Sequence, residues 1–320
     1  MKRYLVTGGS GFIGRALVRA LVERGDFVRS LDDESRGDCK FLADIRKDID
    51  FFKGDVRDPD VVLNAVHGVD CIVHLAYING TAAFYTKPDV ILDVAVRGMS
   101  NLMDAAIKKN VPEFSLASSS EVYQTAPTFP TDETVPLSVP DVLNPRYSYG
   151  GGKIISELMA VNFGRKYFQK CTIFRPHNVY GPHMGTAHVI PQLIERVRDL
   201  QGNRLQIQGS GEETRAFVYI SDFTRGLLTV LDRGAHLNVY NIGTQEEVKI
   251  ADLAKAIGRL FGREIEIIPG ELPPGGTLRR CPDISKIRKL GYFATVPLSA
   301  GLAHCVEAAT AADKSMAVSA

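Results

Sequence analysis

The chain has 320 residues, of which 45% are hydrophobic and 23% are charged, as in an ordinary globular protein of one large or two small domains. Its formal net charge of +1 gives no reason to expect a nucleic acid or an anionic membrane as a partner. No stretch approaches the ~18 unbroken apolar residues of a membrane span, and the five scattered cysteines include no C-x-x-C pair, so we predict neither a disulfide framework nor a metal site.

The first residues predict a strand, a glycine loop and a helix in direct succession. Residues 2–6 read as a short buried strand, and residues 15–24 repeat apolar side chains at helical spacing. In this context the three glycines between them let the backbone turn tightly and approach a pyrophosphate, whose charge a helix N-terminus favours. A plain strand-to-helix turn is the alternative. The predicted dinucleotide site comprises Gly8, Gly11, Phe12, Ile13 and Gly14. Because no apolar signal-peptide core precedes the strand, we expect the protein in the cytoplasm.

A second strand, residues 27–31, ends at Asp32. Asp32 follows Gly14 at close to the ~20-residue separation at which an acidic residue meets the ribose hydroxyls of a dinucleotide. Its carboxylate would repel a 2′-phosphate, so NAD is favoured over NADP, while Arg36 nearby keeps NADP from being excluded. The alternative for Asp32 is a helix cap or a turn residue.

Two further strands are predicted at residues 49–54 and 70–75. The carboxyl ends of strands in a doubly wound sheet lie at the ligand crevice, so the residues there are candidates for cofactor contacts. For His74 we favour a buried histidine with satisfied hydrogen bonds. The candidates at these strand ends are Asp55, Val56, Leu75 and Ala76.

The next segment combines a long helix, residues 88–109, with a strand, residues 111–117. Hydroxyl groups and a carboxylate follow at the carboxyl end of that strand, where they could hydrogen-bond a substrate alcohol or move a proton. A serine-rich turn is the alternative. The residues concerned are Ser118, Ser119, Ser120 and Glu121. Residues 127–145 contain five prolines and are predicted to be a loop.

Tyr149 and Lys153 are four residues apart, which places both side chains on one face of a helix. There the ammonium group can stabilise a phenolate and lower a tyrosine pKa that starts at ~10. Such a phenolate is a usable general base for an alcohol proton. The intervening residues 150–152 are all glycine, each of which costs a helix ~1 kcal/mol relative to alanine. We therefore expect a ligand or another part of the chain to approach this helix closely.

The second half predicts shorter elements separated by loops. The alternation of strands and helices in the first half indicates a parallel sheet with helices on both faces, and the second half indicates a smaller, mixed α/β lid-like domain. The tail beyond Glu307 is small and polar and is expected to fray. The strands expected in this half are residues 171–174, 205–209, 239–242 and 264–268, and the helices are residues 189–200, 223–231 and 250–261.

These motifs and their order resemble the extended short-chain dehydrogenase/reductase family, in particular its nucleotide-sugar epimerases and dehydratases. The resemblance extends from Thr7 to about Leu298 and includes the later motifs at 178–182, at Arg215 and at Arg280. It implies a Rossmann-type doubly wound parallel sheet with a smaller mixed α/β substrate-binding domain. The expected NAD-binding domain comprises residues 1–171 plus about 214–242. The expected nucleotide-sugar-binding domain comprises about 172–213 plus 243–320.

The resemblance implies a role for each matching residue. Tyr149 is the catalytic base, Lys153 holds the nicotinamide ribose and lowers the tyrosine pKa, and Ser119 is the hydroxyl partner of the sugar O4. Asn178 and Ser120 contact the substrate, and two arginines, Arg215 and Arg280, clamp the nucleotide diphosphate, a task that suits their planar fork. The residues implied for NAD are Gly8, Gly11, Phe12, Ile13, Gly14, Asp32 (ribose), Asp55 and Val56 (adenine), Leu75, Ala76 and Lys153.

The shared chemistry that this resemblance implies is oxidation at C4 of a nucleotide-linked hexose. Reduction of the 4-keto sugar from the other face gives an epimerase, which is our leading interpretation. A second base would give a dehydratase or a decarboxylase. The third interpretation, from another class, is a catalytically silent sensor of nucleotide sugars or dinucleotides.

The chain departs from the family pattern at several positions. Ser120-Glu121 replaces the Asp-Glu pair of one dehydratase subgroup and resembles instead the decarboxylases and the mannose-type dehydratases, in which the glutamate does chemistry. The alternative for Glu121 is a salt bridge or a cap. Ala95 replaces an asparagine found in many members, and Gly152 replaces the serine that often precedes the active-site lysine.

The expected partners are a nucleotide-diphosphate sugar and a second copy of the chain. Family members commonly dimerise through two helices per subunit, here those around 88–109 and 149–167, although the apolar residues of the first could equally be core. The loops at 79–86, 183–190 and 271–280 are expected to read the base and the sugar of the substrate, since loops vary freely on a rigid scaffold.

Overall fold

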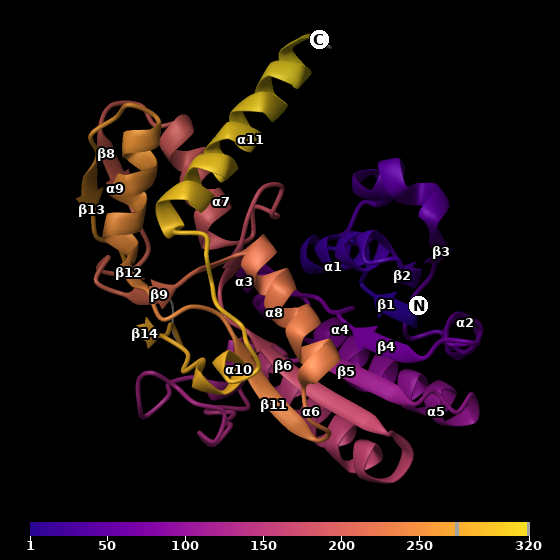
Figure 1. Cartoon of the computed structure of the whole chain (residues 1–320). Coiled ribbons are helices and arrows are strands. Elements are labelled where there is room, and N and C mark those ends of the chain that lie inside the picture. The colour runs from indigo at the N-terminus through magenta and orange to yellow at the C-terminus, as the bar shows by residue number, and fades with distance from the viewer. Residues whose placement is uncertain (273–274, 319–320) are drawn as a thin grey trace.

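The computed structural model describes residues 1–272 and 275–318 (Figure 1). Residues 273–274, in the loop expected at 271–280, and residues 319–320, at the end of the second expected domain, lie outside the described residues. Within the described ranges, no helix combines the length and the apolar character that a membrane span requires.

A seven-stranded sheet forms the centre of the fold. Its strands are β1 (Arg3–Thr7), β2 (Phe27–Asp32), β3 (Ile49–Lys53), β4 (Cys71–His74), β5 (Glu113–Ala117), β6 (Lys170–Pro176) and β11 (Asn238–Ile242). They are ordered β11-β6-β5-β4-β1-β2-β3, and every pair is parallel. The chain leaves β1 toward β2 and β3 and then returns to the other side of β1 with β4. This reversal is the topological switch point at which doubly wound sheets bind ligands, and the predicted fold class is confirmed.

Helices cover both faces of this sheet (Figure 1). Alternate side chains of β1 point to opposite faces, so Tyr4 and Val6 belong to one hydrophobic core and Leu5 to the other. The first core lies under α1 (Phe12–Glu23) and α8 (Ile220–Arg233). The second core lies under α2 (Pro59–Ala65), α5 (Met99–Lys108) and α6 (Tyr147–Tyr167). Buried on both faces, the strands read as nearly continuous apolar runs, as parallel strands do.

The helical segment predicted at 88–109 has a wide turn in its middle. It begins as α4 (Pro88–Asp93), widens into a π-helical turn over Val94–Gly98, and continues as α5. A β-carbon built on Gly98 would lie 2.8 Å from a methyl carbon of Val56, so the helix approaches the loop after β3 closely. Wide turns of this kind are frequent beside functional sites, and this one faces α6 across Ala95.

A third hydrophobic core lies apart from the large sheet, at the upper left of Figure 1. It is built from α7 (Val189–Arg198), α9 (Ile250–Leu260), α11 (Leu298–Val318), β8 (Arg204–Gln206) and β13 (Glu266–Ile268). Two small sheets connect it to the large one. These are β12-β9-β14 (Glu247–Lys249, Thr214–Ala216 and Arg279–Arg280) and β10-β7 (Val218–Tyr219 and Val179–Tyr180). A short helix, α10 (Ser285–Arg288), packs against β11.

Several elements differ from the sequence prediction. A 3-10 segment over Cys39–Asp48, the helix α3 (Thr81–Thr86) and short elements such as β7, β12, β14 and α10 lie where no element was predicted. The tail beyond Glu307, which was expected to fray, continues α11 as far as Val318, because alanine, the best helix former, recurs along it. Strand β6 keeps the chain in the large sheet up to Pro176. The division of the chain into two domains stays a prediction, as does the cytoplasmic location.

Candidate active site

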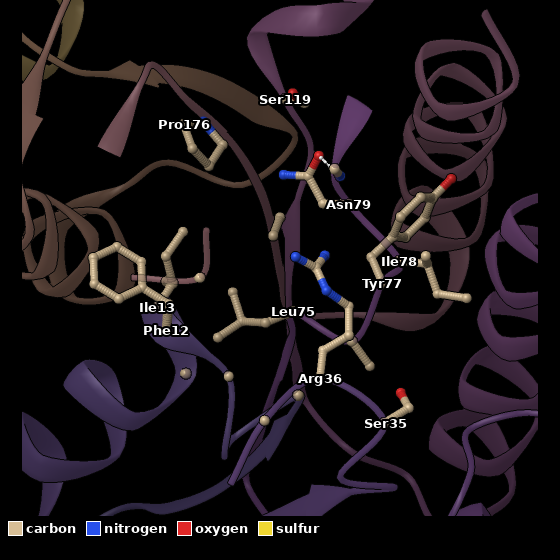
Figure 2. A pocket seen from close by; sticks show the side chains of 18 of the residues that line it. Phe12, Ile13, Ser35, Arg36, Leu75, Tyr77, Ile78, Asn79, Ser119 and Pro176 are labelled. Carbon is tan, nitrogen blue, oxygen red and sulfur yellow. Dashed lines mark hydrogen bonds between the residues drawn. The ribbon is translucent and has the colours of Figure 1, made fainter. Parts of the chain in front are cut away.

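A cavity of about 870 Å³ lies at the carboxyl ends of the parallel strands. In Figure 2, Phe12 and Ile13 lie on one side of it and Tyr77 and Ile78 on the other, with Arg36 and Leu75 between them. All but one of the predicted site residues line this cavity. They are Gly8, Gly11, Phe12, Ile13, Gly14, Asp32, Asp55, Val56, Leu75, Ala76, Ser119, Ser120, Glu121, Tyr149, Lys153, Asn178 and Arg280.

The glycine loop has the close approaches that a phosphate cradle needs. Gly8 has a φ of +73°, which a side chain would strain, and a β-carbon there would lie 2.7 Å from the amide nitrogen of Ala76. A β-carbon on Gly14 would overlap the carbonyl oxygen of Gly8. Helix α1 starts directly after this loop, and no side chain caps its first amides. Those amides are therefore available to an anion, and the loop fits the pyrophosphate of a dinucleotide.

Asp32 lies at the carboxyl end of β2 and is 7% exposed. Its carboxylate accepts hydrogen bonds from the backbone amides of Ser10 (2.9 Å) and Glu34 (2.8 Å). Burial raises the pKa of Asp32, while the two amides oppose that shift. Arg36 extends into the middle of the cavity (Figure 2) and makes no ion pair within the described part of the chain. Asp32 therefore lies where the ribose of the predicted cofactor is expected, whereas the charge of the Arg36 guanidinium acts on Tyr149 and His188, farther into the cavity.

Replacing Asp32 by alanine is expected to shift cofactor preference toward NADP by about tenfold or more. Two like charges 4 Å apart repel by on the order of 1–4 kcal/mol between the limits of water and a protein surface, and each ~1.4 kcal/mol is a factor of ten. The measurement is the pair of dissociation constants for NAD and NADP, with Asp104→Ala on α5 as a charge-matched control. An unchanged ratio in Asp32→Ala would remove this residue from cofactor discrimination.

The predicted residues after β3, and His74 at the end of β4, form hydrogen bonds or ion pairs with other side chains. Asp55 forms an ion pair with Arg57 (Oδ2 to Nη2, 2.6 Å), which lowers the pKa of Asp55. The carbonyl of Val56 accepts a hydrogen bond from Asn101 (3.0 Å). His74 is 2% exposed, its Nδ1 lies 2.7 Å from the Thr7 hydroxyl, and burial lowers its pKa to about 3. The prediction of a buried, hydrogen-bonded histidine is confirmed.

Tyr149 and Lys153 lie on one face of α6, inside the cavity wall. Both are buried, at 6% and 3% exposure. Burial raises the pKa of Tyr149 to about 12, and a hydrogen bond with Ser119 acts against that rise. The Lys153 ammonium donates to the carbonyl of Ala117 (2.7 Å), and burial lowers its pKa to about 7 while Glu157 acts in the opposite direction. Three of the four residues predicted to be catalytic, Tyr149, Lys153 and Ser119, therefore lie close together in the cavity wall.

Glu121 is bound to Arg280 across the cavity. Their Oε1 and Nη1 atoms are 2.8 Å apart, and the side chains are 20% and 11% exposed. Burial acts to raise the pKa of Glu121, but Arg280, together with Arg146 and Arg215, holds it below its usual value. The structure therefore contains the salt bridge that was the alternative to a catalytic role for Glu121. Because its pKa is lowered, this carboxylate carries no proton near neutral pH.

Arg215 is the one predicted site residue that does not line the cavity. Its guanidinium donates to the carbonyls of Thr277 (2.6 Å), Thr214 (2.7 Å) and Leu278 (3.3 Å). The parallel pairing of β14 with β9 places Arg280 beside it. Burial and Arg280 lower the pKa of Arg215 to about 10. In this structure only Arg280 of the two expected phosphate clamps faces the cavity.

Asn178 lies at the cavity wall with a φ of +42°, in the left-handed region. Its side-chain amide donates to the carbonyl of Ala216 (3.1 Å) and so ties the loop after β6 to β9. Because this hydrogen bond uses the side-chain nitrogen, the side-chain oxygen of Asn178 is the atom that could accept a hydrogen bond from a substrate. The substrate roles of Asn178 and of Ser120, which is 4% exposed, stay predictions.

Two aromatic residues of the site were missed at the sequence level. Tyr77 lies edge-on to Tyr149, with ring centroids 5.2 Å apart, and Phe84 of α3 stacks on it at 4.9 Å. The sequence signal for Tyr77 is its place directly after the predicted cofactor residues Leu75 and Ala76. Phe84 lies within the loop at 79–86 that was expected to read the substrate, but no residue of that loop was singled out, since α3 was not predicted.

The glycine run of α6 accommodates neighbouring parts of the chain. A β-carbon on Gly150 would lie 3.0 Å from the carbonyl oxygen of Glu121, and one on Gly151 would lie 3.4 Å from Val139. A β-carbon on Gly152 would overlap the hydroxyl oxygen of Tyr77. The expectation that another part of the chain approaches this helix closely is confirmed.

With this geometry in hand, sequence comparison identifies the family. Residues 4–243 match the sequence model described as the NAD dependent epimerase/dehydratase family. This stretch is well over half of the chain, and the chain therefore belongs to the NAD-dependent epimerase/dehydratase family. Its members are enzymes, so the alternative of a silent sensor is not retained, and the prediction of NAD as the cofactor is confirmed at the level of the family.

Individual relatives cover several reactions. A UDP-N-acetyl-alpha-D-glucosaminuronate decarboxylase of Bacillus cytotoxicus is 30% identical over 91% of this chain and 92% of its own. The structure is similar to that of a dTDP-glucose 4,6-dehydratase of Streptomyces venezuelae with NAD bound, with a TM-score of 0.87, 29% identity, and 97% of each chain covered.

A UDP-glucose 4-epimerase of Thermotoga maritima, solved with UDP-glucose, has a TM-score of 0.87 and 29% identity, with 97% of this chain and 99% of that one covered. The resemblance seen in the sequence is confirmed at the level of the extended short-chain dehydrogenase/reductase family. Because the relatives are epimerases, dehydratases and decarboxylases, they define the class of NAD-dependent nucleotide-sugar enzymes and leave the particular reaction open.

Proposed function

We propose that this protein is an NAD-dependent nucleotide-sugar epimerase that oxidises C4 of a nucleotide-linked hexose and reduces the 4-keto intermediate again. The observation that carries the proposal is the grouping of Tyr149, Ser119 and Lys153 on one wall of a cavity that also contains the glycine loop. A general base, a hydroxyl partner and an ammonium group within one site suit proton removal from a secondary alcohol.

In the proposed reaction, Tyr149 takes the proton of the C4 hydroxyl, and Ser119 hydrogen-bonds the sugar oxygen. When bound, NAD+ supplies the hydride acceptor. Burial raises the pKa of Tyr149 to about 12 even though Ser119, Arg36 and Arg280 act to lower it, so the base depends on further positive charge to ionise near neutral pH. Lys153, on the same helix face, supplies that charge and would hold the nicotinamide ribose. Rotation of the keto sugar before it is reduced gives the C4 epimer.

Glu121 is the reason to place the epimerase ahead of the other reactions. Its carboxylate is held by Arg280 and ionised, so it has no proton to donate to a departing hydroxyl group. The residue beside it, Ser120, is not a carboxylic acid. A 4,6-dehydratase needs an acid for water to leave from C6, and neither residue is one at neutral pH.

The alternative is a 4,6-dehydratase or a decarboxylase that uses Glu121. An ionised Glu121 is a competent base, and the Ser120-Glu121 pair resembles the decarboxylases and the mannose-type dehydratases. The relative from Bacillus cytotoxicus named above is itself a decarboxylase. This alternative requires a substrate group that displaces Arg280 from Glu121.

A substrate screen separates the two readings. The protein is incubated with NAD and, in turn, with UDP-, GDP-, CDP- and dTDP-linked hexoses and hexuronic acids, and the products are followed by NMR. A C4 epimer supports the proposal. A 4-keto-6-deoxy sugar or released carbon dioxide supports the alternative, and binding without turnover of any of these substrates contradicts both.

We also propose that the protein is a homodimer through the helices expected at 88–109 and 149–167. Large apolar side chains on these helices are exposed: Leu92 at 37%, Val96 at 41%, Ile155 at 41% and Leu158 at 59%. Exposed apolar side chains grouped on helices favour an interface.

Light scattering at micromolar concentration is expected to report twice the chain mass, and Leu158→Asp is expected to halve it. Lys255→Asp on α9, away from both helices, serves as the control. A monomer in the unaltered protein would refute the dimer.

A further inference from the structure

The Lys153 ammonium is buried without a carboxylate partner. Its side chain is 3% exposed, and its one hydrogen bond within the described chain goes to the carbonyl of Ala117. The carboxylate whose charge acts on it, Glu157, accepts hydrogen bonds from the Nε and Nη2 atoms of Arg175. A buried cation is costly unless other groups compensate for its lost hydration. One hydrogen bond to a neutral carbonyl gives only a small part of that compensation.

The aromatic face of Tyr77 lies over this cation. The Lys153 nitrogen is 3.7 Å from the centre of the Tyr77 ring, well within the ~6 Å range of a cation–π contact. The same nitrogen is 6.0 Å from the centre of the Tyr149 ring. Since Tyr77 also lies edge-on to Tyr149 at 5.2 Å, with the ring planes at 88°, it contacts both members of the predicted catalytic pair.

The far end of Tyr77 is accommodated by two small residues. Its hydroxyl oxygen is buried and has no hydrogen-bond partner within the described chain. It lies where any side chain on Gly152 would be, and a β-carbon there would also be 2.9 Å from the β-carbon of Ala95. Ser156 links the backbones of these two small residues. Its hydroxyl donates to the carbonyl of Gly152 (2.9 Å) and lies 3.5 Å from the carbonyl oxygen of Ala95. Glycine at 152 therefore makes room for the tyrosine hydroxyl, and the small Ala95 lies beside the same space.

We propose that Tyr77 is the positioning residue for Lys153, holding the ammonium beside Tyr149 through its aromatic face, and that Gly152 is small so that this ring fits. The role in turnover rests on the proposed function, whereas the contact with Lys153 does not. The ring keeps the ammonium on the cavity side of α6, where Lys153 lines the predicted cofactor site. Burial keeps the Tyr77 phenol neutral by raising its pKa, so it acts through its ring and not as a second base.

The contact has a defined electrostatic sign. A π face stabilises the charged form of lysine, so its loss lowers the lysine pKa. The groups around the ammonium are Glu157 and Tyr149 on α6, Tyr77 after β4 and His74 at the end of β4. Burial lowers the pKa of His74 to about 3, so this imidazole is neutral. Of these groups Glu157 is the one whose charge opposes the effect of burial on Lys153.

The test compares Tyr77→Leu with Tyr77→Phe in the full chain. The titration midpoint of Lys153 is followed by NMR of ε-13C-labelled lysines, with Lys153→Met to assign the signal, and NAD affinity is measured in parallel. Tyr77→Leu is expected to lower the midpoint by about one pH unit and to weaken NAD binding roughly tenfold. Tyr77→Phe keeps the ring. It should leave the ionisation constant of Lys153 and the dissociation constant of NAD each within about twofold of the parent values. A midpoint that is unchanged or higher in Tyr77→Leu overturns the proposal.

If Tyr77→Leu does not fold, a second series of variants tests the same contact. Phenylalanines that carry one to three ring fluorines at position 77 keep the shape of the ring and weaken its π face, so the Lys153 midpoint should fall stepwise. In addition, Gly152→Ser should lower the thermal midpoint more in the parent protein than in Tyr77→Ala, where the ring that the serine side chain would meet is absent. A flat fluorine series, or an equal effect of Gly152→Ser in both backgrounds, contradicts the proposal. If the parent protein converts no nucleotide sugar, the proposed function fails, yet these readouts still decide the role of Tyr77.

Discussion

Tyr149→Phe is expected to lower nucleotide-sugar turnover by roughly 10²- to 10⁴-fold, the range typical of a general acid–base group. The variant lacks the phenol oxygen that is proposed to take the C4 proton, while the buried ring stays in place between Tyr77 and Phe84. NAD binding should persist, because the glycine loop and Asp32 are untouched. Turnover is measured by NMR of the sugar products under saturating NAD.

The matched control is Tyr167→Phe, which makes the same change at the far end of α6, where the side chain is 43% exposed. It should leave turnover within about twofold, since surface substitutions away from special features are close to neutral. Activity in Tyr149→Phe equal to that of this control would rule out the proposed base.

Arg175→Leu is expected to reduce the free energy of unfolding by about 3–5 kcal/mol, the usual cost of breaking a buried ion pair on one side. Arg175 is 3% exposed, and its Nε and Nη2 atoms contact the two carboxylate oxygens of Glu157 at 2.8 and 2.6 Å. It also donates to the hydroxyl of Tyr123 (2.6 Å). The pair joins β6 to α6 one turn beyond Lys153, so its loss leaves an uncompensated carboxylate in the core.

Urea unfolding gives the measurement, and two further variants give its controls. Arg204→Leu breaks an exposed pair with Glu266, whose side chains are 68% and 56% exposed, and should cost less than about 1 kcal/mol. Arg175→Leu combined with Glu157→Leu should recover part of the loss, since no unpaired charge then remains. A cost for Arg175→Leu as small as that for Arg204→Leu would show that the pair contributes little.

Local patterns made the N-terminal half predictable. A buried strand, a glycine loop and a helix follow one another within 1–24, so their physical relation is contained in neighbouring residues. The same holds for Tyr149 and Lys153, whose spacing alone determines that they share a face of α6. The structure places these residues around one cavity, as expected.

Elements without a strong local period were harder to predict. The short helix α3 and the 3-10 segment over 39–48 offer too few residues for a periodic signal. The π-helical turn within 88–109 depends on the close packing of Gly98 against Val56, which the helical spacing does not reveal.

The sequence by itself determined the fold class, the glycine loop with its acidic partner, and the Tyr149–Lys153 pair, because each depends on residues close together in the chain. Only the tertiary structure decided what those residues contact. It binds Glu121 to Arg280, 159 positions away. It turns Arg215 toward backbone carbonyls, and it places Tyr77 against Gly152 and over Lys153. Such contacts follow from how distant strands and helices pack, and no local spacing encodes the distance between two side chains that meet only when the whole sheet has formed.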